Sequence, residues 1–315
     1  MKALDLGKRD LLLWGSLALV PLIIKNDFYL DALIMMMLWA AVAGAWNIGG
    51  GYAGLISLGH SAFFGIGAYT STLLFVRAGG SPWLGLLLGA ALAGGFGLIL
   101  GGITIRLRGP FFVLTTLAFA EVMKIVAINW HGLTKGAEGV SVPFRPSLLN
   151  LVFYGKTGYF YVTLAFLVFT YGISRWLNRS RLGYYLVAFR ENACAAEAAG
   201  VDTLRTRLIA LTLSAFLTAM GGTLYAQYVG FLEPEHAFAT HLSIQIALMA
   251  IIGGMGTAAG PIIGAVLITA FGTFLRTTLG GAVEGLHLVL YGLLLVAGVL
   301  FMPQGVVSWF SRRHR

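Results

Sequence analysis

The amino-acid sequence predicts an all-α polytopic membrane protein of about ten transmembrane helices, organised as one domain over residues 1–315. Of its residues, 58% are hydrophobic and only 10% are charged, whereas about 25% are charged in ordinary soluble domains. Apolar runs long enough to cross a bilayer, which takes roughly 20 residues, recur along the whole chain. Glycine is also frequent, at 43 of 315 residues. Because small residues let membrane helices approach closely, we expect some helices to be short, broken or tightly crossed.

The first apolar run, residues 11–24, follows the basic residues Lys2, Lys8 and Arg9. This order resembles a signal peptide, but the charged sequence KND follows where a small-x-small cleavage site is expected. The sequence therefore favours an uncleaved first span. It leaves open whether this run crosses the membrane completely.

Nine further spans are predicted, and they cover residues 28–48, 55–76, 83–103, 111–129, 159–177, 208–229, 241–252, 261–279 and 286–302. If the N-terminus is cytoplasmic and the spans alternate, 14 of the 21 Lys and Arg residues lie on the cytoplasmic side. Six then lie outside, and Lys124 lies within a span. This asymmetry follows the positive-inside rule, so we expect both termini to be cytoplasmic. The formal charge of +9 is then explained by topology rather than by nucleic-acid binding.

The longest polar interruption, residues 175–207, joins the sixth and seventh predicted spans, and about residues 178–207 of it are expected to form a cytoplasmic segment. Within it, Arg190 and Glu191 lead into an alanine-rich, helix-prone run that ends at Gly200. A compact charged helix on the cytoplasmic side is typical of a surface presented to a cytosolic partner. The flanking arginines are interpreted as topology anchors: Arg175, Arg179, Arg181, Arg205 and Arg207.

Two glycine-rich stretches, residues 47–68 and 252–265, are predicted to interrupt the helices. Each places a glycine pair ahead of a small-residue helix, Gly50-Gly51 in the first and Gly253-Gly254 in the second. Unwound backbone at membrane depth is tolerated where it is buried in protein or lines a cavity. Matching breaks in two halves of a transporter point to the transport pathway. The two stretches are therefore either an internal repeat that lines a pathway or two independent packing faces.

Three ionisable residues within spans are candidates for lining such a pathway: His60, Glu121 and Lys124. Glu121 and Lys124 are three residues apart and share a helix face. They either contact a zwitterionic substrate or form an internal ion pair, in which Lys124 extends towards the headgroups. His60 follows the first glycine break and either lines the pathway or hydrogen-bonds a carbonyl of the unwound backbone.

The sequence lacks the motifs of an enzyme that binds its own cofactor. The nearest approach to a nucleotide-binding loop is Gly155-Lys156-Thr157, but Asn150 stands where the first glycine of that loop is required. No HExxH, GxSxG or paired Cys and His at metal spacing occurs, and the single Cys194 excludes an internal disulfide. We therefore expect a transport subunit without a bound cofactor or metal rather than a membrane enzyme.

Four stretches carry a resemblance to a known family: residues 47–69, 105–121, 180–201 and 252–265. In this order they resemble the LivM-type permeases of bacterial branched-chain amino-acid ABC importers. The resemblance implies that the cytoplasmic helix acts as the coupling loop of an ABC permease and docks in a cleft of the ATPase. The residues carried over by position are Arg190, Glu191, Glu197, Ala198, Ala199 and Gly200. Tyr184 and Tyr185 depart from the small or basic residues common in the family, which puts the edge of the docking surface in doubt.

The resemblance also implies the partners of this chain. They are a second homologous permease subunit, two cytoplasmic ATPase subunits that hold ATP and Mg²⁺, and a periplasmic or lipid-anchored substrate-binding protein. The expected activity is import of branched-chain amino acids across the bacterial inner membrane by alternating access. Two alternatives remain open: the same architecture importing urea, short amides or another small solute, and a motor-independent secondary transporter or channel.

Overall fold

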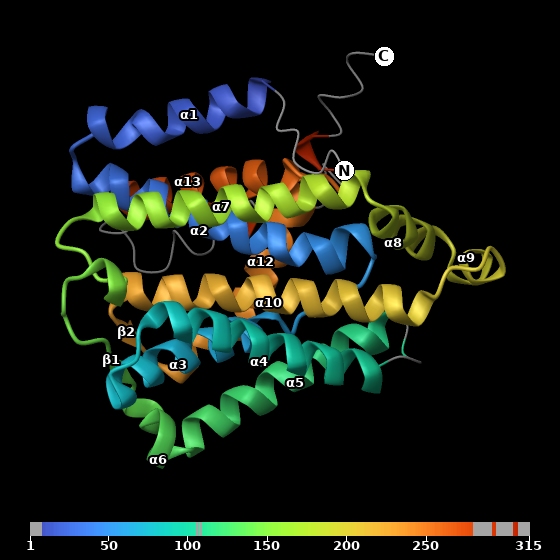
Figure 1. Cartoon of the computed structure of the whole chain (residues 1–315), viewed down its shortest axis with the longest axis horizontal. Helices are drawn as coiled ribbons and strands as arrows, with labels where there is room; N and C mark the ends of the chain where they lie inside the picture. Colours follow the sequence, from blue (N-terminus) through green and yellow to red (C-terminus); the bar gives the residue numbers. More distant parts are fainter. Residues whose placement is uncertain (1–7, 105–106, 108, 280–291, 294–304, 308–315) are drawn as a thin grey trace.

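The computed structural model describes residues 8–104, 107, 109–279, 292–293 and 305–307, and it forms a bundle of helices (Figure 1). Six of the described helical stretches are long and apolar enough to cross a membrane. They are α2 with the π-helical turn η1 (Asp27–Asn47 and Ile48–Tyr52), α4 (Pro82–Ile103), α5 (Pro110–Asn129), α7 (Lys156–Arg179), α10 (Thr203–Val229), and α11 with α12 (Pro234–Ala237 and Thr240–Gly254). The chain is therefore a multi-pass membrane protein.

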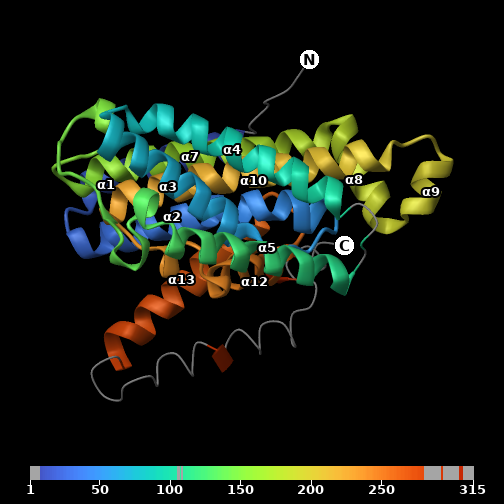
Figure 2. The ribbon, with the colours of Figure 1, turned by 90° about the horizontal axis from the view of Figure 1, so that it is seen from below.

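The remaining elements complete the bundle. The helices are α1 (Lys8–Ile23), α3 (His60–Ala78), α6 (His131–Thr134), α8 (Arg181–Glu191), α9 (Ala193–Ala198) and α13 (Gly260–Leu279). Two 3-10 turns, η2 (Gly136–Glu138) and η3 (Leu148–Asn150), and the antiparallel pair β1 (Val140–Ser141) and β2 (Phe231–Leu232) lie in the connections. Figure 2 shows that the second half of α13 diverges from the bundle.

Nine of the ten predicted spans coincide with helices, and the tenth, residues 286–302, lies almost entirely outside the described residues. The number ten is therefore not confirmed. The third span was predicted to begin at Leu55, but α3 begins at His60, because the chain between η1 and α3 is irregular and Gly54 has a positive φ of 69°. The polar segment was predicted to contain one helix over residues 190–200, but Asn192 divides it into α8 and α9.

Short polar side chains set the boundaries of several helices, since they accept hydrogen bonds from main-chain N–H groups that a helix start leaves unpaired. Ser180 accepts from Gly183 N at the start of α8, and Asn192 accepts from Ala195 N at the start of α9. Asp202 accepts from Arg205 N at the start of α10. These three caps explain why the polar segment folds into successive short helices rather than one long one.

Helix α10 packs against α3, α4 and α2 in the middle of the bundle (Figure 1). Glycines allow the close approach of α3 and α10. A Cβ added at Gly67 would fall 2.6 Å from the Ala219 carbonyl carbon, and one at Gly222 would fall 2.8 Å from that of Phe64. The predicted role of glycine in tight helix packing is confirmed at this interface.

The basic side chains separate to the two ends of the bundle. We call the end that carries α8 and α9 the coupling end, and the end that carries β1 and β2 the opposite end (Figure 1). In both views α9 projects beyond the neighbouring helices. By their positions in, or next to, the elements that reach each end, Arg175, Arg179, Arg181, Arg190, Arg205 and Arg207 belong to the coupling end, and Lys25, Arg77, Lys135, Arg145 and Lys156 belong to the opposite end. Spans that alternate in direction place successive connections, and the basic residues in them, at opposite ends of the bundle in this way.

Candidate functional site

The two glycine-rich breaks meet inside the bundle. Helix α2 ends in the π-helical turn η1, and α12 ends at Gly254, after which the chain is irregular until α13 begins at Gly260. The buried side chain of Asn47 joins the two breaks. Its Nδ2 donates to the Thr257 carbonyl oxygen at 2.9 Å, and its Oδ1 accepts from Gly256 N at 2.9 Å. One amide therefore holds together segments that lie about 210 residues apart.

Close main-chain approach explains why glycine stands at this junction. A Cβ added at Gly51 would lie 2.5 Å from Gly256 N, which real Cβ atoms do not tolerate. Gly254 and Gly256 have φ values of 127° and 74°, in the region that favours glycine. The junction thus depends on both the space and the backbone freedom that glycine provides.

The four glycines predicted to line a pathway are packed against protein. A Cβ added at Gly50 would meet the ring of Trp46, and one at Gly253 would lie 2.5 Å from the Gly260 carbonyl carbon. None of Gly50, Gly51, Gly253 and Gly254 lines the cavity described below. Their role as pathway residues stays a prediction, whereas their role in packing is visible.

Arg190, the penultimate residue of α8, reaches from the coupling end to this junction. Its Nη1 donates to the Gly51 carbonyl oxygen at 2.8 Å. Its Nε and Nη2 donate to Glu191 Oε1 at 3.1 and 2.7 Å, so Glu191 holds the guanidinium in place. The aliphatic part of Arg190 lies against Gly54, where an added Cβ would be 2.8 Å from Cγ. Arg190 therefore connects the segment predicted to bind the ATPase with the broken end of α2.

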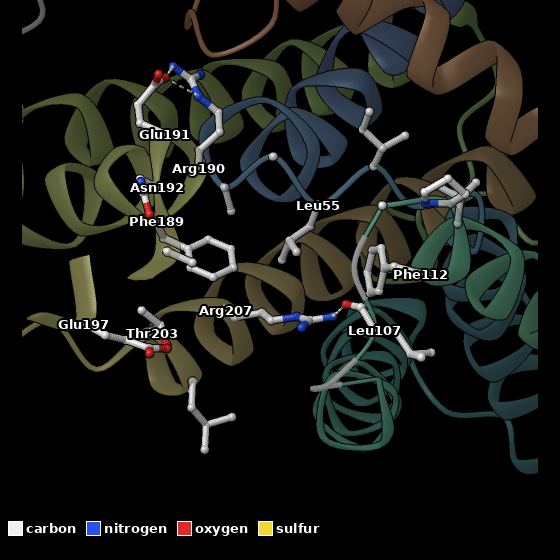
Figure 3. Close-up of a pocket in the computed structure, with 18 of the residues that line it drawn as sticks. Leu55, Leu107, Phe112, Phe189, Arg190, Glu191, Asn192, Glu197, Thr203 and Arg207 are labelled. Atoms are coloured by element: carbon white, nitrogen blue, oxygen red, sulfur yellow. Dashed lines mark hydrogen bonds and ion pairs between the residues drawn. The ribbon is translucent and has the colours of Figure 1, made fainter. Parts of the chain in front are cut away.

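A cavity of about 910 Å³ lies beside Arg190 at the coupling end (Figure 3). Its walls come from the irregular segment after η1, from the start of α5 and from the α8–α9–α10 connection. Leu55, Phe112 and Phe189 provide apolar walls, and Arg190 and Glu197 provide charged ones. Because both the break and the polar segment contribute walls, a shift of α8 relative to η1 changes the shape of this cavity.

Arg207 has a structural role that the sequence did not reveal. It was interpreted as a topology anchor, but its side chain is only 5% exposed. Its Nη2 donates to the Thr104 and Leu107 carbonyl oxygens at 2.7 and 3.3 Å, and its guanidinium carbon lies 5.0 Å from the centre of the Phe112 ring. Arg207 thereby holds the α4–α5 connection against α10. No local signal distinguishes it from Arg205, whose side chain is 82% exposed two residues earlier.

The remaining residues of the predicted coupling surface are exposed. Ala198, Ala199 and Gly200 lie on the surface at the end of α9, and Gly200 ends the helix with a φ of 85°. Glu197 accepts a hydrogen bond of 2.5 Å from Thr203 Oγ1, which fixes α9 to the start of α10. The surface is available to a partner, and docking itself stays a prediction.

His60 is buried in the core at the start of α3. Its Nε2 lies 2.7 Å from Ser214 Oγ, and Ser214 Oγ donates to the Ala45 carbonyl oxygen at 2.7 Å. Since the single hydroxyl proton of Ser214 goes to Ala45, His60 Nε2 is the donor to Ser214. His60 Nε2 thus bonds a neighbouring helix, α10, and His60 does not line the cavity.

Glu121 and Lys124 form an ion pair, one of the two arrangements expected from their spacing, with 2.6 Å between Lys124 Nζ and Glu121 Oε2. The structure adds Thr240 at the start of α12, whose hydroxyl donates to Glu121 Oε1 at 2.5 Å. The two charged side chains are 35% and 26% exposed, respectively. The ion pair and Thr240 fix α5 to α12, and contact of the pair with a substrate stays a prediction.

Among the described residues, no three His, Cys, Asp or Glu side chains gather closely enough to hold a metal ion. Cys194 is a free, exposed thiol on α9. The geometry links an exposed helical segment, a cavity and a junction of two broken helices through Arg190.

Comparison with known proteins gives consistent matches along the chain. A family model described as "Branched-chain amino acid transport system / permease component" matches residues 28–299. The "High-affinity branched-chain amino acid transport system permease protein LivM" of Salmonella typhimurium is 29% identical over 300 residues, which cover 88% of this chain and 69% of that relative. The permease protein LivH of Escherichia coli, named for the same kind of system, is 24% identical over 84% of this chain and 92% of its own length.

A more distant relative carries a different substrate in its name. The "Nucleoside ABC transporter permease protein NupC" of Lactococcus lactis is 26% identical over 81% of this chain and 84% of its own length. No solved structure matches the chain significantly.

Proposed function

Because this chain belongs to the family of permease components of branched-chain amino acid transport systems, we propose that it is the membrane-spanning subunit of an ATP-driven importer. Its cargo is a branched-chain or similar apolar amino acid, moved inward across the bacterial inner membrane by alternating access. Residues 1–315 form one permease domain, and residues 178–207 form its coupling segment.

The hydrogen bond between Arg190 and Gly51 is the observation that supports this mechanism best. It connects an exposed helical segment, suited to a soluble motor, with the point where α2 is broken. Movement of α8 and α9 on ATPase closure would pull on η1 through Arg190 and, through Asn47, on the end of α12. When one packed element is displaced against another, a local event shifts the equilibrium between two global conformations, here the inward-facing and outward-facing ones.

The assembly follows from this role. A second homologous permease, two cytoplasmic ATPase subunits that bind ATP and Mg²⁺, and a periplasmic or lipid-anchored binding protein complete the transporter. The coupling end and both termini face the cytoplasm. This orientation is supported by the larger number of arginines at the coupling end.

Co-purification followed by reconstitution tests this function. The full-length chain is tagged and purified from its own host, its partner chains are identified, and the complex is placed in proteoliposomes with the binding protein. Leucine transport that requires hydrolysable ATP is expected, and a non-hydrolysable analogue serves as the control. Uridine is tested in parallel because of the nucleoside permease relative. Leucine transport that persists without ATP, or transport of uridine but not leucine, contradicts the proposal.

A further inference from the structure

A second cavity, of about 610 Å³, lies at the opposite end of the bundle. It is bounded by the starts of α2 and α7 and the end of α10, which lie together at the left of Figure 1. Residues 142–144 and 152–155 of the α5–α7 connection form another wall. Its volume is within the usual range of small-molecule sites, about 300–1,000 Å³. None of its lining residues belongs to the junction or the cavity at the coupling end.

This cavity contains groups of both charges. Lys156 Nζ lies 3.0 Å from Asp31 Oδ1, and the hydroxyl of Tyr228 also donates to that oxygen. The two charged side chains are 33% and 46% exposed, so a solute reaches them. An ammonium has three donors and a carboxylate about four acceptor sites, which leaves both groups able to bind a ligand as well as each other.

A buried amide that has no partner lines the same cavity. The side chain of Gln227 is 3% exposed, and within the described part of the chain neither its Nε2 nor its Oε1 has a hydrogen-bond partner. Buried polar side chains are nearly always hydrogen-bonded, so an amide unpaired at both atoms calls for an explanation. A ligand with both a donor and an acceptor would satisfy it.

Aromatic and aliphatic side chains complete the walls. The rings of Tyr159 and Tyr228 pack edge to face with centroids 5.2 Å apart, and those of Phe144 and Tyr154 do so at 5.9 Å. Met35 adds an apolar surface. Such walls favour an apolar side chain on the ligand, because most of a ligand's buried area in a typical site lies against apolar groups.

We propose that this cavity binds a zwitterionic amino acid with an apolar side chain. Lys156 contacts its carboxylate, Asp31 contacts its ammonium group, and Gln227 hydrogen-bonds to either end. The inference rests on the proposed function and deepens it by assigning a receiving site on the face opposite α8 and α9. No sequence motif indicated this site, because its polar residues come from three helices separated along the chain.

Ligand binding to the full-length chain in lipid nanodiscs tests the proposal. The probes are L-leucine, leucine amide, which lacks the carboxylate, 4-methylpentanoate, which lacks the ammonium group, and uridine. The readouts are equilibrium dialysis and the shift of the thermal midpoint. The variants are Lys156→Met and Gln227→Leu, with Lys25→Met as the matched control, since Lys25 is an exposed lysine at the same end of the bundle outside the cavity lining.

Leucine is expected to bind the wild-type chain and Lys25→Met equally and to raise their midpoints. Lys156→Met and Gln227→Leu are expected to lower the affinity at least tenfold, and both leucine analogues are expected to bind at least tenfold more weakly than leucine. Because the Gln227 side chain has no hydrogen bond to lose among the described residues, Gln227→Leu is expected to keep or raise the midpoint of the ligand-free chain. A misfolded variant is thereby distinguished from one that has lost only its ligand.

Three results overturn the site: no leucine binding to the wild type, equal leucine binding by Gln227→Leu and the wild type, or tighter binding of uridine than of leucine. These experiments distinguish a failure of the binding site from a failure of the proposed function. Leucine import by the assembled transporter without leucine binding to this cavity rejects the site alone. Binding through Lys156 and Gln227, combined with transport that does not need ATP, rejects the ATP-driven importer alone.

Discussion

The guanidinium of Arg190 donates from Nη1 to the main-chain oxygen of Gly51 at 2.8 Å, although 139 residues separate them. This bond joins the exposed helical segment of the coupling end directly to the broken end of α2. Hydrogen bonds from charged donors contribute more to stability than neutral ones, roughly 1.5–3 kcal/mol. A single such bond is therefore strong enough to transmit a displacement between the two elements.

Arg190→Glu is expected to lower leucine uptake about tenfold or more while ATP hydrolysis continues, since a charge-assisted bond worth roughly 1.5–3 kcal/mol is lost and replaced by repulsion from Glu191. The measurement is uptake and phosphate release in the reconstituted complex. Arg205→Ala is the control, because Arg205 is exposed and its ion pair is with the neighbouring Asp202. Unchanged uptake in Arg190→Glu would remove the link. Loss of the ATPase from the purified complex would instead support direct docking by Arg190.

Asn47→Leu is expected to reduce the free energy of unfolding by about 1–3 kcal/mol, because it leaves the N–H of Gly256 and the carbonyl of Thr257 without their partner. Thermal unfolding in detergent measures the change. Asn129→Leu serves as the control, since the exposed Asn129 side chain bonds the Ile125 carbonyl oxygen within its own helix, and a change within about 0.5 kcal/mol is expected there. Equal effects of the two substitutions would argue against the junction as a stabilising contact.

Gly51→Ala is expected to abolish uptake and to lower the yield of folded protein. The added Cβ would lie 2.5 Å from Gly256 N and would push the two breaks apart. Gly102→Ala on α4 is the matched change, because nothing lies within 4 Å of its added Cβ, and alanine favours a helix by about 1 kcal/mol over glycine. Uptake and size-exclusion profiles are compared for both. Wild-type behaviour of Gly51→Ala would show that the junction is not close-packed.

Glu121→Ala and Lys124→Ala, made singly and together, are expected to show coupling. The double variant should lose less stability than the sum of the two single variants, by about 0.2–1 kcal/mol, the range for partly exposed ion pairs. Thermal unfolding of the four proteins gives this difference. Strictly additive losses would mean that the 2.6 Å ion pair does not contribute to stability.

Cys194 and a cysteine introduced at Gly155 are expected to react with an impermeant thiol reagent from opposite sides of the membrane. Cys194 is exposed on α9, and Gly155 is exposed just before α7 with room for a side chain. Gly155→Cys is made together with Cys194→Ser, so that each protein carries one thiol. Labelling of intact cells at residue 155 but not at residue 194 is expected. Labelling of both from outside would contradict the orientation proposed for the coupling end.

Prediction from the sequence succeeded where the signal is local. Apolar length placed nine spans on helices, the spacing of Glu121 and Lys124 indicated an ion pair as one of two arrangements, and glycine pairs marked both breaks. It was wrong where packing decides the outcome. The start of α3 moved to His60, where the side chain bonds Ser214 on α10. The helix predicted over residues 190–200 is divided for a different, local reason that was not predicted: Asn192 caps a new helix.

Arg205 and Arg207 also show that the sequence does not predict which of two nearby side chains is buried. Both were interpreted as topology anchors, yet Arg207 is buried against Thr104 and Phe112 and Arg205 is exposed. Two residues along a helix rotate a side chain to a different face. Which face meets the α4–α5 connection depends on how the helices pack, and no pattern in the sequence records that.

The sequence by itself determined that this chain is a multi-pass membrane protein, where its helices break and how its charges divide, because these properties follow from local composition and the cost of burying charge in lipid. Only the tertiary structure decided that the two breaks meet at Asn47 and that Arg190 connects them to the coupling end. The same is true of the gathering of Asp31, Lys156 and Gln227 around one cavity. These arrangements bring together segments more than 70 residues apart in the sequence. They exist only because the helices pack side by side.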